Sequence, residues 1–314
     1  SFCPLGGVSL PNRVIRPKPK MWEPGLREAL GHLFRNGAPC SKAVIQGKES
    51  RQMSKGVTYG SYLRLPDLLA AQRPQTGEHD ELLFVILHQT MELWMKQAIH
   101  EIGAAQAEVR TGNLVPAYKH LARVSRIQAV MTQTWDILAT MTPADYLNFR
   151  NLLGTSSGFQ SAQFRVLEYK LGIKDDSFLK FHDAGSEDRA MLEAALNAPS
   201  LYDDALRQLA AAGFNIPKSA YERPAGAPYE SSEAVEDAWL EVYRDTTKYW
   251  SLYQLAEKLI DLDDAFLTWR HKHVLTVERI IGRKRGTGGT EGVGYLQQTL
   301  TRRAFPEIWS LRTK

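Results

Sequence analysis

Helical periodicity continues through almost the whole chain after Gly56, and this feature excludes most other folds. Apolar residues recur every three or four positions in two long runs, from Asp80 to Gly112 and from Leu114 to about Ala139. This spacing places them on one face of a helix, whereas a half-buried strand needs an alternation that is sustained nowhere here. The sequence therefore predicts an all-α protein.

Capping and breaking residues predict where the other helices begin and end. Thr142 can cap a short helix, and the loop 154–158 precedes another helix that Gly172 can close in a left-handed conformation. A long pattern from Glu233 to Ile281 is expected to be interrupted once, since more than about 25 uncapped helical residues are unusual. We expect a last helix from Val293.

The predicted architecture is one domain, residues 55–314, in which long antiparallel helices form a bundle that encloses a cofactor pocket. The sequence holds no internal repeat that would indicate a second domain. Helical bundles build such sites from side chains on facing helices. Residues 174–232, where Gly and Pro recur, are expected to be a peripheral insertion of short helices.

The net positive charge of the chain lies in residues 1–54. That segment has nine Lys/Arg and three Asp/Glu, whereas the rest has 30 basic and 32 acidic residues. A nucleic-acid-binding protein carries its positive charge on one face of the folded body. Here the charge belongs to a Pro- and Gly-punctuated leader that we expect to be poorly ordered. We expect no nucleic-acid partner.

Membrane and disulfide-based folds are also excluded. No uncharged apolar run reaches the roughly 18 residues of a membrane helix, and the first residues lack the apolar core of a secretory signal. The two cysteines, Cys3 and Cys40, both precede the helical region. They offer no disulfide scaffold or thiolate metal site to the main body, so we expect a cytoplasmic protein without a membrane partner.

Two histidines near the end of the long C-terminal pattern are candidate ligands. His271 and His273 point about 200° apart on a helix, so they cannot bind one metal together. His273 shares its stripe with Phe266 and Trp269, and a neutral imidazole facing an apolar interior can be an axial haem ligand. A core histidine bonded to a backbone carbonyl fits the same spacing, so both interpretations stay open.

His88 lies on the most apolar of the predicted helices, with Phe84 one turn before it and Glu92 one turn after it. Dimetal bundles use Glu-x-x-His on paired helices, and no second copy with the present spacing exists. We therefore expect His88 to place a polar tip in an aromatic pocket, either in the core or facing a ligand.

A possible carboxylate clamp and a glycine-rich loop complete the candidates. Arg150 follows Tyr146 by one turn, and its planar guanidinium could bind a carboxylate through two hydrogen bonds, although a structural arginine fits the pattern too. The glycines around Thr287 follow a helix, whereas phosphate-binding loops follow strands. We interpret this loop as a lid that closes on a small ligand.

Four long motifs, in this order, resemble those of the tryptophan 2,3-dioxygenase family, and the likeness runs roughly from Gly56 to the C-terminus. The resemblance implies haem-dependent cleavage of the indole C2–C3 bond of L-tryptophan by O2. The product would be N-formyl-L-kynurenine, in the first step of tryptophan catabolism by the kynurenine pathway. The motifs are YGSYLRL (59–65), HDELLFVILHQTMELWMK (79–96), NLLGTSSGFQSAQFRVLEYKLG (151–172) and WRHKHVLTVERIIGRKRGTGGTEGVGYL (269–296).

The resemblance also implies roles for single residues. His273 would be the axial ligand of a haem b iron, ferrous in the active state. His88 would hydrogen-bond the indole N–H and orient the substrate, with Phe84 packed on the ring. Arg150, with Tyr146 beside it, would bind the carboxylate of L-tryptophan. The residue contacting the substrate ammonium would be Thr287.

The family resemblance implies a homotetramer, a dimer of dimers. Tyr59, Tyr62 and Leu63 match an N-terminal element that reaches into a neighbouring subunit's pocket, whereas residues 1–54 match nothing expected of the family. One alternative is a haem-dependent oxidase or hydroxylase of another aromatic amino acid on the same scaffold. Another is a non-enzymatic helical protein that binds or senses haem.

Overall fold

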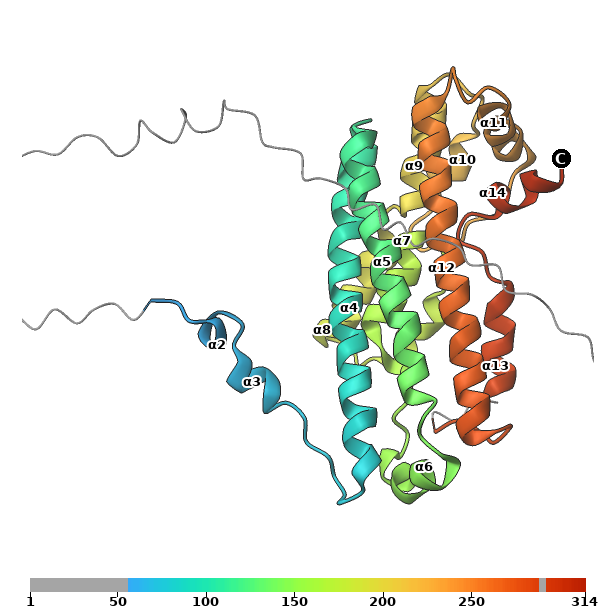
Figure 1. Ribbon diagram of the computed structural model, residues 1–314. Coiled ribbons are helices and arrows are strands. Elements are labelled where there is room, and N and C mark those ends of the chain that lie inside the picture. The colour runs from blue at the N-terminus through green and yellow to red at the C-terminus, as the bar shows by residue number, and fades with distance from the viewer. Residues whose placement is uncertain (1–55, 288–291) are drawn as a thin grey trace, which may run out of the picture. The chain divides into compact units, whose positions relative to one another are not determined.

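The computed structural model describes residues 56–287 and 292–314. Every regular element in these two ranges is a helix, and neither range contains a strand (Figure 1). The all-α prediction is therefore confirmed. Within the same ranges, no helix is both long and apolar enough to cross a membrane. The leader predicted for residues 1–54 lies outside the described residues.

Three long helices form the body of the bundle. The two that are consecutive in the chain, α4 and α5, form an antiparallel hairpin, as expected (Figure 1). The third, α12, runs parallel to α5: Tyr118 bonds the Ser251 carbonyl at one end, and Arg279 bonds the Ala139 carbonyl at the other. The pairing of α5 with α12 thus differs from the antiparallel arrangement predicted. Their bounds are α4 (His79–Arg110), α5 (Leu114–Leu138) and α12 (Trp250–Ile281).

Shorter helices and single turns fill the rest of the described chain. The α-helices are α2 (Tyr59–Tyr62), α3 (Leu65–Leu69), α6 (Pro143–Arg150), α7 (Ala162–Leu171), α8 (Glu187–Asn197), α9 (Leu201–Ala211), α10 (Lys218–Tyr221), α11 (Glu233–Arg244), α13 (Val293–Gln298) and α14 (Pro306–Ser310). The 3-10 turns are η1 (Asn151–Leu153), η2 (Gly158–Gln160), η3 (Asp176–Phe181), η4 (Thr299–Thr301) and η5 (Leu311–Thr313).

The predicted capping residues set most of these ends. Thr142 caps α6 in a reciprocal capping box, and Gly172 ends α7 at φ +119°, in the left-handed region that favours glycine. The expected interruption separates α11 from α12. Helix α4 begins at His79, just before the apolar run that starts at Asp80, and its N-cap is Glu78. The buried Glu81 carboxylate accepts two backbone N–H groups of the preceding loop and so ties that loop to the first turn of α4.

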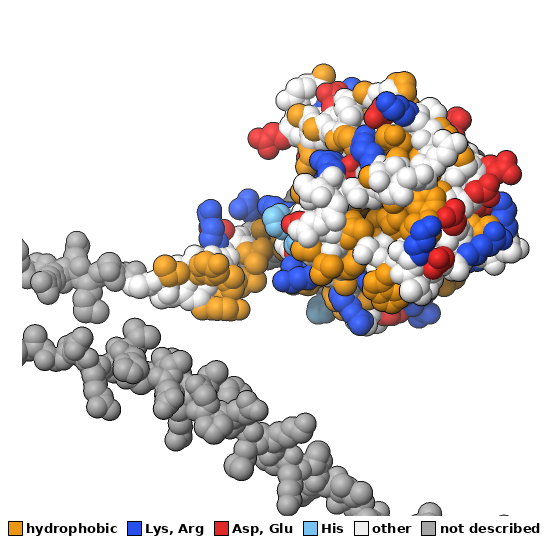
Figure 2. All heavy atoms as spheres, turned by 90° about the horizontal axis from the view of Figure 1, so that it is seen from above, with side chains coloured by type: hydrophobic (Ala, Val, Ile, Leu, Met, Phe, Trp, Pro, Cys, Tyr) orange, Lys and Arg blue, Asp and Glu red, His pale blue; other side chains and the backbone are white. Residues whose placement is uncertain are grey.

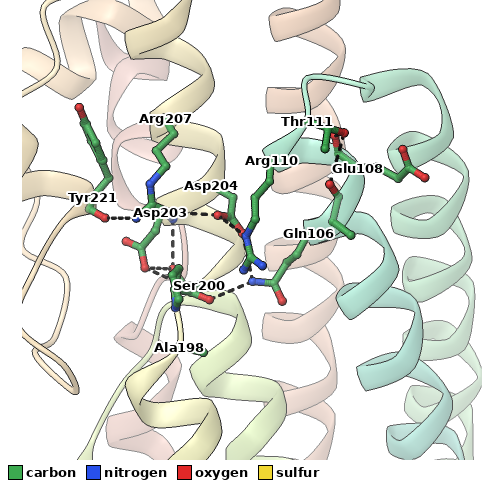
Figure 3. Close-up of polar contacts among 12 residues, drawn as sticks. Gln106, Glu108, Arg110, Thr111, Ala198, Ser200, Asp203, Asp204, Arg207 and Tyr221 are labelled. Atoms are coloured by element: carbon green, nitrogen blue, oxygen red, sulfur yellow. Dashed lines mark hydrogen bonds and ion pairs between the residues drawn. The ribbon is translucent and has the colours of Figure 1, made fainter.

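The segment 174–232 is helical as expected, but α9 within it is core rather than periphery. Leu206 and Leu209 are fully buried, and so is Asp204. The Asp204 carboxylate accepts hydrogen bonds from Arg110 at 2.9 Å and from Gln106 at 3.3 Å, both on α4. Figure 3 shows these α4 side chains directed toward α9. A buried carboxylate is costly unless charged or hydrogen-bonding groups surround it. The hydrogen bonds from Arg110 and Gln106 therefore fix α9 against α4.

A buried carboxylate also ties α4 to α5. The Glu101 side chain is 4% exposed and accepts hydrogen bonds from His120 and Arg123 of α5, each at 2.6 Å. Burial acts to raise the pKa of Glu101, but these donors together outweigh burial and hold the pKa below its usual 4.5. Because the folded state prefers the ionised carboxylate, this contact stabilises the hairpin above about pH 4.5 and is lost as the pH falls further.

We expect Glu101→Gln to lower the free energy of unfolding at pH 7 by about 1.5–3 kcal/mol, because hydrogen bonds to a charged group are lost. The loss should shrink below pH 4, where the wild-type carboxylate itself takes up a proton. Urea unfolding at both pH values measures this. Glu193→Gln, in an exposed ion pair with Arg189, is the matched control and should change stability little. An equal loss for Glu101→Gln at both pH values would contradict the assignment.

Candidate active site

His88 of α4 is held in an aromatic environment by its own helix. Its Nδ1 lies 2.8 Å from the Phe84 carbonyl oxygen, and the two rings are 4.2 Å apart between centroids. Since a carbonyl only accepts, Nδ1 carries the proton, which leaves Nε2 as the acceptor of the neutral ring. Burial lowers the pKa of His88, against the opposing effects of the Phe84 carbonyl and Glu92. His88 is therefore a neutral hydrogen-bond acceptor near pH 7.

His273 of α12 is stacked between the helices. The Trp135 ring of α5 lies parallel to it, with 4.4 Å between centroids and 9° between planes, and Trp269 contacts both rings. Burial lowers the pKa of His273 to about 3, and the nearby His88 adds to this effect. An imidazole in this environment is neutral near pH 7 and keeps a lone pair for a metal.

The structure distinguishes the two histidines that lie two residues apart. His271 is exposed, and its Nδ1 bonds the Leu267 carbonyl one turn back at 2.9 Å. His273 makes no hydrogen bond to any residue that the structure describes. A histidine bonded to a backbone carbonyl, the alternative left open for His273, is thus found at His271 instead. The His273 ring is held by stacking on Trp135.

Arg150 ends α6 and has unused hydrogen-bonding capacity. One terminal nitrogen bonds the Arg285 carbonyl at 2.5 Å, whereas its buried Nε has no partner among the described residues. Burial raises the pKa of the neighbouring Tyr146 hydroxyl, and the positive charge of Arg150 opposes that rise. A guanidinium with a free buried N–H beside a tyrosine hydroxyl can bind a planar anion such as a carboxylate.

Aromatic rings connect the arginine to the histidine of α4. The Tyr146 ring lies 5.5 Å from Phe149 and 6.1 Å from Phe84, which in turn packs on His88. Tyr146 and Phe149 are buried. The structure therefore brings Phe84, His88, Tyr146 and Arg150 together along one aromatic wall, with an anion-binding group at one end and an imidazole at the other.

Two loops meet beside Arg150. The Thr287 hydroxyl donates a hydrogen bond to the Ser156 carbonyl at 2.5 Å, which joins the loop after α12 to the loop between η1 and η2. The base of the first loop is closed at Gly292, where φ is +62°. A Cβ on Gly292 would lie 2.6 Å from the Lys284 carbonyl oxygen, so only glycine fits there.

Tyr59, Tyr62 and Leu63 are not joined to this site by any hydrogen bond, ion pair or ring contact in the described part of the single chain. They belong to α2 and its C-cap, and their exposed fractions are 77%, 76% and 41%. Figure 2 shows hydrophobic side chains on the surface of the segment that precedes the bundle.

Sequence reasoning missed three participants. Trp135 belongs to a different helix from His273, and nothing in the sequence pairs the two positions. The carbonyl groups of Arg285 and Ser156 are backbone acceptors, which have no sequence signal at all. The contact of Trp135 with His273 could have been found only from the alignment of α5 with α12 in the fold.

Comparison with known proteins gives consistent matches. The sequence model of the family described as tryptophan 2,3-dioxygenase matches residues 42–242 and 240–314, and so begins within the segment predicted as a leader. The tryptophan 2,3-dioxygenase of Caulobacter vibrioides is 64% identical over 262 residues, 83% of this chain and 100% of the relative. The enzyme of Ralstonia pickettii is 54% identical over 83% of this chain and 94% of the relative. The enzyme of Bacillus cereus is 50% identical over 87% of this chain and 98% of the relative.

Proposed function

The chain belongs to the tryptophan 2,3-dioxygenase family, and on this premise we propose that L-tryptophan binds between Arg150 and His88, beside a haem held by His273. The activity is cleavage of the indole C2–C3 bond with O2 to give N-formyl-L-kynurenine, the first step of the kynurenine pathway. The observation that carries the site assignment is the aromatic wall from Arg150 through Tyr146 and Phe84 to His88.

The residues around His273 fit a haem. A histidine that held the haem iron would need to be neutral with a free lone pair, and burial keeps His273 in that form. Stacking on Trp135 fixes the plane of the ring, and Trp269 adds a second apolar wall. When bound, haem b supplies the activation of dioxygen. The protein supplies the ligand, the apolar surroundings and the position of the substrate.

Recognition of the amino-acid group needs partners for both of its charges. The substrate carboxylate would replace the Arg285 carbonyl on Arg150 and would also use the unpaired Nε, a stronger interaction because both groups are charged. The Thr287 hydroxyl donates its proton to the Ser156 carbonyl, so its lone pairs remain to accept a hydrogen bond from the ammonium. Phe84 and Tyr146 cover the indole.

His88 would orient the indole. Its Nε2 is an acceptor because Nδ1–H is bonded to the Phe84 carbonyl, and the indole N–H only donates. The lowered pKa of His88 makes it a weaker base, and the indole N–H is itself a very weak acid. A hydrogen bond that positions the ring is therefore the better role than removal of the proton.

We also propose that the chain forms a homotetramer, a dimer of dimers, in which Tyr59, Tyr62 and Leu63 complete the pocket of a neighbouring subunit. Their exposed fractions in the single chain support this assignment, since burying an aromatic ring contributes about 1.5–3 kcal/mol. A cytoplasmic location also stays a proposal, supported by the presence of only two cysteines.

The product formed from labelled dioxygen tests the function. The reduced, haem-loaded protein is mixed anaerobically with L-tryptophan, isotopically labelled O2 is admitted, and the product mass is measured. Both atoms of one O2 molecule should enter one tryptophan. Gain of a single atom would indicate the hydroxylase alternative instead. No haem absorbance after haem supplementation would exclude both enzymes and leave a helical protein of another function.

His273→Ala should abolish haem retention, whereas His271→Ala should retain it, because His271 is exposed and bonded to its own helix. The Soret absorbance per protein after desalting measures this. Restoration of the Soret band in His273→Ala by added imidazole, which can replace the missing ligand, would separate a lost ligand from misfolding. Full haem retention in His273→Ala would contradict the assignment of the axial ligand.

Arg150→Ala should raise KM for L-tryptophan by about a hundredfold or more with haem content unchanged, because a charge-assisted pair with the carboxylate is lost. Arg150→Lys should recover only part of this, since lysine keeps the charge but not the planar fork. Arg279→Ala, at an exposed arginine that bonds the Ala139 carbonyl, is the control and should leave KM unchanged. An unchanged KM in Arg150→Ala would exclude the clamp.

A further inference from the structure

One buried guanidinium of α12 bonds two other elements of the chain. Arg270 lies on α12, three residues before His273, and its side chain is 3% exposed. One terminal nitrogen bonds the carbonyl groups of Thr299 and Arg302, each at 3.2 Å, and the other bonds Glu168 at 2.6 Å. Helix α12 is thereby tied to η4 and to α7.

Each of these partners follows one of the two loops of the substrate site. Glu168 lies on α7, the helix after the loop 154–158. Thr299 and Arg302 lie in and after η4, directly behind α13 and the loop that carries Thr287. The elements that follow both loops, α7 and η4, are therefore fixed to the helix that carries His273 through a single side chain.

Aromatic side chains join the same two loop ends a second time. Arg165 of α7 pairs with the other oxygen of Glu168 at 2.5 Å, and its guanidinium lies 4.0 Å from the centroid of the Phe178 ring. Phe159, directly after the loop 154–158, contacts Phe178 and also packs on Tyr295 of α13, with 4.7 Å between centroids. The Arg165–Glu168 ion pair and the three rings thus form a continuous series of contacts from α7 to α13.

The tips of the loops meet at the substrate-binding residues. Thr287 bonds the Ser156 carbonyl, and Arg150 bonds the Arg285 carbonyl. These tip contacts are hydrogen bonds to exposed loop backbone, which open easily. The position of Thr287, and the contact of Arg150 with the Arg285 carbonyl, therefore depend on how firmly these loops are held.

We propose that Arg270 and Glu168 are a positioning pair that holds both loops of the substrate site in register with the helix that carries His273. The assignment deepens the proposed function and rests on it for the identity of the substrate. Neither side chain contacts the substrate: the pair acts through the loops that carry Thr287 and the Arg285 carbonyl, which Arg150 bonds.

A purely stabilising role accounts less well for this arrangement. A buried ion pair contributes little net stability compared with apolar side chains of the same volume, because both charges lose their hydration. Its geometry is demanding, however, since every buried N–H and carboxylate oxygen needs a partner. Arginine satisfies Glu168 and two carbonyl groups at once, whereas the point charge of lysine cannot reach all three.

The test is hydrogen–deuterium exchange of the full-length, haem-loaded protein without substrate, followed by mass spectrometry. In Arg270→Lys, the peptides covering 154–161 and 292–301 should both exchange about tenfold or more faster, as local opening of the loop ends becomes easier. KM for L-tryptophan should rise while the haem content stays constant. Glu168→Gln, which keeps the side-chain shape, should show the same effects more weakly and serves if Arg270→Lys does not fold.

Arg223→Lys is the matched control. Arg223 pairs with the buried Asp203 at 2.6 Å and is 12% exposed, but it contacts neither loop. It should leave both loop peptides and KM unchanged. Unchanged exchange in either loop peptide of Arg270→Lys, an equal increase throughout the bundle, or an unchanged KM would overturn the proposal. The exchange result does not depend on turnover, so wild-type protein without activity would contradict the proposed function and not the positioning pair.

Discussion

A histidine kept neutral in an aromatic interior is the constraint on which the rest of this site depends. His273 lies between two long helices, stacked on Trp135, where protonation would place an uncompensated charge in an apolar environment. The ring is therefore available as a ligand under physiological conditions. Its position depends on how α5 packs against α12, so the bundle core determines where the ring lies.

The polar half of the site is organised differently. Arg150 and Thr287 lie at helix ends and in loops, and their present partners are backbone carbonyl groups. A carbonyl is a weaker partner for a guanidinium than a carboxylate, so a substrate can take its place. The Arg270–Glu168 pair then explains how loops with exchangeable contacts keep a fixed position relative to a rigid helix.

Much of this could be predicted from sequence because it depends on local pattern. Helical periodicity, the Thr142 cap, the Gly172 stop and the inward direction of His273 all follow from residues a few positions apart. The parallel direction of α12 and the burial of α9 could not be predicted, because helix propensity does not determine which helix faces pack against each other. The contact of Trp135 with His273 depends on that same non-local packing.

The most direct measurement of the central claim is the absorbance spectrum of the reduced, haem-loaded protein during an anaerobic titration with L-tryptophan. A substrate held between Arg150 and His88 beside the haem should change the Soret band in a saturable way. Tryptamine, which lacks the carboxylate, should need a concentration about a hundredfold or more higher, because it forms no pair with Arg150. An unchanged spectrum, or equal affinity for the two compounds, would contradict the account.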